Sequence, residues 1–82
     1  MGKVLTVMKV FPEEGVKLEE LQAAILKVEG CNTCKIIDFV FGSKVIQASF
    51  VCEDAKSVDF EEIVRKVAGV NEVQVEEVGL IS

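Results

Sequence analysis

Three cysteines are the residues of this chain best suited to chemistry. Cys31 and Cys34 form a Cys-Asn-Thr-Cys motif, and Cys52 supplies the third thiol. A Cys-x-x-Cys pair can act as a dithiol redox couple or supply half of a zinc site. Structural zinc takes four ligands, and this sequence has no histidine, so a zinc site within one chain would also need carboxylates. A small metal- or thiol-redox-handling domain is therefore one hypothesis.

An internal repeat favours a structural role for the pair. The segment 27–32, Lys-Val-Glu-Gly-Cys-Asn, recurs at 66–71 as Lys-Val-Ala-Gly-Val-Asn. The repeat aligns Cys31 with Val70 and Cys34 with Val73, both at positions expected to face inward. Cysteine behaves as a small hydrophobic residue in cores. A thioredoxin-like pair opens a helix, whereas this pair opens a predicted strand, so we expect core-filling thiols.

No other set of residues predicts a catalytic centre. The sequence contains no Ser-His-Asp set, P-loop or Gly-x-Gly-x-x-Gly motif, and we expect neither a cofactor nor a bound metal. Nine basic and fourteen acidic residues give a net charge of -5, which disfavours binding to nucleic acid. Adjacent acidic residues are typical of solvated surfaces; they are Glu13-Glu14, Glu19-Glu20, Glu61-Glu62 and Glu76-Glu77. We expect a binding protein rather than an enzyme.

The elements that position these residues follow from hydrophobic periodicity. Strands are predicted at 3–11, 33–40, 44–52 and 72–78, with an amphipathic helix at 17–28. A second helix begins at a cap formed by Ser57 or Asp59, and Gly69 closes it. The apolar stripes of the two helices are Leu18, Leu21, Ile25 and Val28, and then Phe60, Ile63, Val64 and Val67. The order is β-α-β-β-α-β.

This order predicts an α+β fold, the ferredoxin-like βαββαβ sandwich. Its four-stranded antiparallel sheet has the spatial order 4-1-3-2, with both helices on one face. We expect one domain over residues 1–82. No apolar run is long enough for a membrane span or a signal-peptide core, so the expected location is the cytoplasm, with no membrane partner.

The hairpin between the second and third strands carries an aromatic residue beside a glycine. Phe41 precedes Gly42 at the expected turn. One interpretation is a bent strand end tucked onto the core, and the other is an exposed aromatic that contacts a partner. Composition and periodicity leave both open.

Short stretches spread along the chain match the motifs of one family. The first strand ends in Lys9-Val10-Phe11-Pro12-Glu13, which matches Lys-Val-x-Pro-Glu, and the centre holds Phe41-Gly42-Ser43-Lys44, which matches Phe-Gly-x-Lys. The end follows the same pattern through residues 70–75 and Leu80-Ile81. In these motifs and their order the chain resembles archaeal elongation factor 1-beta and the guanine-nucleotide-exchange domain that ends the eukaryotic protein.

The resemblance implies a function without covalent chemistry. The family binds the GTPase elongation factor 1-alpha and speeds GDP release during translation elongation. By this resemblance the partner-binding residues are Phe41, Gly42, Ser43, Lys44, Leu80 and Ile81, with Phe41 packing on the GTPase. Eukaryotic relatives disturb the magnesium site with a lysine next to the C-terminal residue. The matching stretch here, residues 79–82, has no lysine.

Two further function classes remain as alternatives. One is the metal- or redox-handling domain that uses Cys31 and Cys34. The other is a ligand-binding regulatory module of the same fold, which usually works as a dimer.

Overall fold

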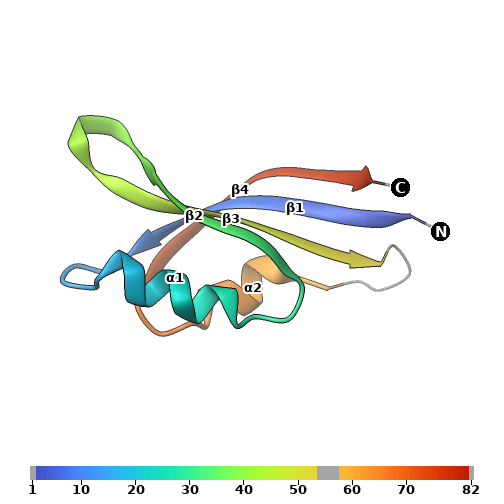
Figure 1. Cartoon of the computed structure of the whole chain (residues 1–82), viewed down its shortest axis with the longest axis horizontal. Helices are drawn as coiled ribbons and strands as arrows, with labels where there is room; N and C mark the ends of the chain where they lie inside the picture. The colour runs from blue at the N-terminus through green and yellow to red at the C-terminus, as the bar shows by residue number, and fades with distance from the viewer. Residues whose placement is uncertain (1, 54–57, 82) are drawn as a thin grey trace.

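A computed structural model of the chain describes residues 2–53 and 58–81 (Figure 1). Four strands form one sheet: β1 (Lys3–Pro12), β2 (Cys31–Asp38), β3 (Lys44–Glu53) and β4 (Val70–Ile81). The helices are α1 (Leu18–Leu26) and α2 (Phe60–Arg65), and a 3-10 turn, η1, covers Val40–Gly42. The sheet order is β2-β3-β1-β4 with antiparallel neighbours, and both helices lie on one face (Figure 1). The predicted ferredoxin-like fold is confirmed.

Several predicted boundaries need correction. Strand β2 begins at Cys31 and ends at Asp38, because the chain turns through η1 where the strand was expected to continue. Strand β4 runs to Ile81, so the apolar end of the chain belongs to the sheet. At α2 the backbone N–H of Glu62 donates to Asp59 Oδ1 at 3.2 Å, which confirms Asp59 as a cap. Ser57, the other candidate cap, lies outside the described residues.

The core fills the space between the helices and the sheet. Phe50 and Phe60 stack at its centre, with ring centroids 4.9 Å apart and planes 18° apart. The other buried residues of this core cluster are Met8, Val10, Leu21, Ile25, Cys34, Ile46, Ala48, Val64, Val70 and Val73. Ile63, expected in the apolar stripe of α2, is 40% exposed. In this short helix Phe60 and Val64 face the sheet, and Ile63 points about 100° away from Val64.

The sequence repeat is also a structural repeat. In each copy the turn after the helix contains a glycine in the left-handed region, Gly30 or Gly69, and both have a φ of 94°. The carbonyl of Gly30 accepts a 2.8 Å hydrogen bond from the backbone N–H of Val51. The carbonyl of Gly69 accepts one of the same length from Glu13. The turn after α1 is therefore hydrogen-bonded to β3, and the turn after α2 is hydrogen-bonded to the residue that follows β1.

In the described part of the chain, neither helix has the length and apolar character needed to cross a bilayer.

Candidate partner-binding site

The β2–β3 hairpin ends in a short loop, residues 39–43, which we call the finger. At its base Asp38 pairs with Lys44, both in the strand register and through a 3.4 Å contact between Oδ1 and Nζ. The backbone N–H of Phe39 donates to the Ser43 carbonyl at 2.7 Å, and the N–H of Ser43 donates to the Val40 carbonyl at 3.1 Å. These bonds close the loop, so its backbone has a defined conformation. Figure 1 shows the hairpin curving away from the helices.

Phe41 stands at the tip of the finger and points into solvent. Its side chain is 100% exposed, and its φ of 58° is the only positive value for a non-glycine residue in the described part. A bulky residue in the left-handed region costs about 1–2 kcal/mol. Gly42 continues the bend with a φ of 76°. Phe41 is therefore exposed, and the interpretation that tucks it onto the core is wrong. Strain at an exposed aromatic is a feature of functional sites.

The expected site residues fall into two separate groups. Phe41, Gly42, Ser43 and Lys44 lie together on the finger. Leu80 and Ile81 lie at the far end of β4, where Leu80 is 71% exposed.

The strand registers set the distance between the two groups. Ile81 pairs with Lys3, which pairs with Glu53 at the opposite end of β3 from Lys44. Ten residues of strand span roughly 30 Å, so the two groups lie at opposite ends of the sheet (Figure 1).

A third apolar residue at the C-terminal end of β4 was not anticipated. Val78 is largely exposed in β4, two residues before Leu80, so both side chains emerge on the same face of the sheet. Val78 pairs with Thr6 and Leu80 with Val4, which lie on the same face of β1 as the buried residues Met8 and Val10. The end of β4 therefore adds an exposed apolar surface, made by Val78 and Leu80, beyond the helices. The alternation of Val78 and Leu80 was the sequence signal that could have revealed it.

Polar and aromatic side chains meet beside the finger on the face opposite the helices. The Phe39 ring contacts Phe11 edge-to-face, with centroids 5.3 Å apart and planes 80° apart. Lys9 Nζ lies 5.4 Å from the centroid of Phe39 and 2.9 Å from Glu76 Oε2. Gln47 Nε2 donates to Glu76 Oε1 at 3.3 Å. We call Phe11, Phe39, Lys9 and Glu76 the anchor cluster; sequence reasoning missed it.

A β-bulge brings Glu76 into the anchor cluster. Val7 pairs with Glu77 and Met8 pairs with Val75, so Glu76 is the extra residue of β4. Bulges change the direction in which a side chain points. The hydrogen bonds from Lys9 and then Gln47 hold the pKa of Glu76 below its ordinary value. No local sequence pattern marks a bulge of this kind.

The cysteines do not form a reactive pair. Cys34 is buried in the core, and its thiol is directed to the carbonyl of Gln22 at 3.8 Å, whereas the thiol of Cys31 lies 3.7 Å from the Thr33 carbonyl. Cys31 and Cys34 are free thiols. Burial raises the pKa of Cys31. Burial, and then the neighbouring Cys31, raise the pKa of Cys34 to about 11.

Residues 2–53 and 58–81 hold no group of three or more potential metal ligands. The structure thus gives the metal and redox hypothesis no support.

Cys34 is expected to resist alkylation in the folded protein. A pKa raised from 9.0 to about 11 lowers the reactive thiolate fraction at pH 8 by about 100-fold. Iodoacetamide labelling, quenched at intervals and read by mass spectrometry, should show at least this slowing relative to the protein in urea. Equal rates in the folded and unfolded states would contradict the buried assignment and revive the redox hypothesis.

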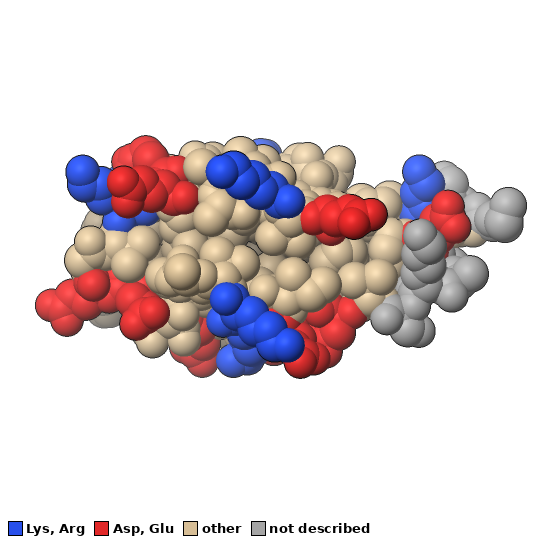
Figure 2. Space-filling view, turned by 90° about the horizontal axis from the view of Figure 1, so that it is seen from below, with Lys and Arg blue, Asp and Glu red and all other residues tan. Residues whose placement is uncertain are grey.

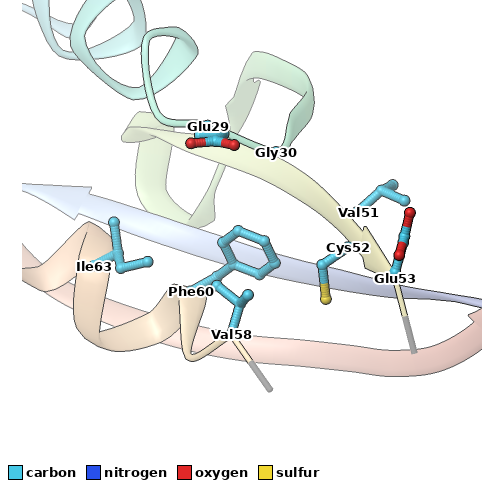
Figure 3. A pocket seen from close by; sticks show the side chains of 8 residues that line it. All are labelled: Glu29, Gly30, Val51, Cys52, Glu53, Val58, Phe60 and Ile63. Atoms are coloured by element: carbon cyan, nitrogen blue, oxygen red, sulfur yellow. The ribbon is translucent and has the colours of Figure 1, made fainter. Parts of the chain in front are cut away.

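A mostly apolar cleft of about 350 Å³ lies between the start of α2 and the end of β3 (Figure 3). Phe60, Ile63 and Val58 line one side, and Cys52 lies opposite them. Its acidic lining residues, Glu29 and Glu53, come from different segments. The described lining offers no assembled acid, base and nucleophile, so the cleft does not form a catalytic centre.

The charges on the helix-bearing face are mixed. Figure 2 shows acidic and basic side chains along its margins and uncharged residues through its middle. Two ion pairs on this side link residues four apart in α2 and its C-cap. They join Arg65 to Glu61 and Lys66 to Glu62. The described part of this face presents no continuous basic surface of the kind that phosphate backbones require.

Fold and site together define a ferredoxin-like domain with a projecting aromatic finger and an apolar strand end. Comparison with family models identifies it further. The model described as the EF-1 guanine nucleotide exchange domain matches residues 5–81, and the chain belongs to this family. It thus has a guanine-nucleotide-exchange role in translation elongation, as the resemblance implied. A search of the curated proteins finds no match.

Proposed function

We propose that this protein promotes release of GDP from elongation factor 1-alpha, acting as a single domain in the cytoplasm. Membership of the exchange-domain family supports the reaction. The observation that carries the contact is Phe41, an aromatic side chain fully exposed at the tip of a closed loop. A rigid aromatic on a projecting loop is well suited to filling a pocket on a partner protein.

Exchange requires no covalent step. The protein binds best to a conformation of the GTPase whose nucleotide site is distorted, and this preference weakens GDP binding. By linkage, GDP weakens the binding of the exchange factor by the same factor. Coupling of this kind is typically worth about 5- to 150-fold in affinity. GTP then enters the emptied site and displaces the factor.

The two ends of the sheet supply two contacts with the GTPase in this proposal. Phe41, Gly42, Ser43 and Lys44 form one, and Leu80 and Ile81 form the other. Leu80 and Ile81 bear exposed apolar side chains, which are suited to displacing loops of the GTPase around its magnesium ion. This takes the place of the lysine that eukaryotic relatives use, which the matching stretch lacks.

Nucleotide release from purified elongation factor 1-alpha tests the proposal. The GTPase is loaded with a fluorescent GDP analogue and chased with excess unlabelled GDP. Substoichiometric amounts of this protein are expected to raise the release rate at least about tenfold, because one factor molecule serves many GTPase molecules. Release at the spontaneous rate, even with stoichiometric protein, would refute the proposed function. Unfolded protein at the same concentration serves as the control.

A further inference from the structure

Phe41 depends on the finger backbone for its position. Its side chain is fully exposed, so the direction of the ring is set by the loop and by whatever holds the base of that loop. The ion pair at the base, between Asp38 and Lys44, is 3.4 Å long and largely exposed, so it contributes little rigidity. Contacts between the finger and the rest of the sheet would add to the support that the pairing of β2 with β3 provides.

The anchor cluster provides such a support. Phe39 is the first residue of the finger, and its ring turns back onto the sheet to meet Phe11 in β1. Lys9 lies over the same ring at a distance suitable for a cation–π contact. The finger is thereby attached to the central strand β1 as well as to its own strands.

Glu76 fixes the position of the lysine. The side chains of Lys9 and Glu76 are only 22% and 31% exposed, and their 2.9 Å contact has the length of a charge-assisted hydrogen bond. The bulge in β4 places Glu76 on this face, and the amide of Gln47 holds its other oxygen. A continuous set of contacts thus runs from β4 through Glu76 and Lys9 to Phe39 at the finger.

We propose that Phe39, Lys9 and Glu76 are positioning residues that hold the finger in the orientation in which Phe41 meets the GTPase, an inference that rests on the proposed function. They act on exchange through Phe41. A finger held in its binding orientation before association loses less conformational freedom on binding. Loss of the anchor cluster therefore weakens productive association while the fold and the Phe41 side chain remain.

The first arm of the test measures finger motion without any GTPase. The sequence has no tryptophan, so Phe41→Trp introduces a single fluorescent reporter at the tip. In this background Phe39→Leu is expected to increase the fast loss of fluorescence anisotropy, whereas Phe39→Tyr, which keeps the ring, is not. Glu76→Gln, which breaks the ion pair with Lys9, is expected to give a smaller increase.

The second arm measures exchange with Phe41 intact. Phe39→Leu is expected to lower kcat/KM for GDP release about tenfold, mainly through KM, and Phe39→Tyr is expected to restore it. Lys35→Met, which removes an exposed lysine from β2, is the matched control and should match the wild type in both arms.

The two arms separate the possible failures. Unchanged reporter motion in Phe39→Leu overturns the positioning role, including the case where exchange falls, because Phe39 would then contact the partner directly. Increased motion with unchanged exchange also overturns it. An inactive wild-type protein refutes the proposed function instead, and the anisotropy arm still reports whether the anchor cluster holds the finger.

Discussion

The Phe41→Ala variant is expected to lose about 30-fold or more in exchange efficiency while its unfolding free energy changes by less than about 0.5 kcal/mol. The first effect follows from truncating an aromatic anchor, which costs about 2–4 kcal/mol when the residue is a hot spot of an interface. The second follows because the Phe41 side chain is fully exposed and packs against no part of its own domain. GDP-release rates and urea denaturation measure the two effects.

Two variants serve as controls for Phe41→Ala. Leu26→Ala removes an exposed apolar side chain from α1, remote in sequence from the finger, and should leave exchange unchanged. Phe41→Gly should lose exchange in the same way but gain about 1 kcal/mol in stability, because glycine relieves the cost of a positive φ. If Phe41→Ala unfolds at much lower urea, or exchanges nucleotide at the wild-type rate, the contact assigned to Phe41 is wrong.

The Gly30→Ala variant is expected to lose about 3–4 kcal/mol of stability. Gly30 has a φ of 94°, where a side chain costs about 1–2 kcal/mol. An added Cβ would also lie 2.9 Å from Phe60 Cζ and 3.1 Å from the carbonyl oxygen of Val51. The ring is held by its stacking on Phe50, so it cannot move aside cheaply. For a domain of this size the melting temperature should fall by roughly 12–32 °C.

Gly15→Ala is the matched control for Gly30→Ala. Gly15 also has a positive φ, 85°, but nothing lies within 4 Å of the position its Cβ would take. Only the backbone cost applies, so a loss of about 1–2 kcal/mol is expected. Calorimetry or thermal denaturation by circular dichroism compares the two variants. Equal losses would show that the contact with Phe60 contributes nothing.

The fold was predictable because several local signals agreed. Three signals indicate the same arrangement of elements: the alternation in β3, the helical stripe through Leu21 and Ile25, and the repeat that contains Gly30 and Gly69. The strand ends were less predictable. A 3-10 turn replaces the last predicted residues of β2. This turn depends on hydrogen bonds across the loop, which produce no hydrophobic periodicity in the sequence.

The site was predictable in part. The position of Phe41 at a hairpin tip followed from the order of strands, whereas its exposure required the structure. The separation of Phe41 from Leu80 was implicit in the sheet order, because β3 and β4 both run away from the finger end. The pairing of Lys9 with Glu76 depends on a bulge in strand register, which is a property of two chain segments together and not of either alone.

The hydrogen bonds of Gly30 and Gly69 cross between the two halves of the chain. Gly30, in the first β-α-β unit, is bonded to Val51 in the second, and Gly69, in the second, is bonded to Glu13 in the first. The sheet order likewise places β3 between the two strands of the first unit. Because β1 and β2 are not neighbours in the sheet, neither β-α-β unit forms a continuous sheet without strands of the other. The two units must therefore fold together in one cooperative step.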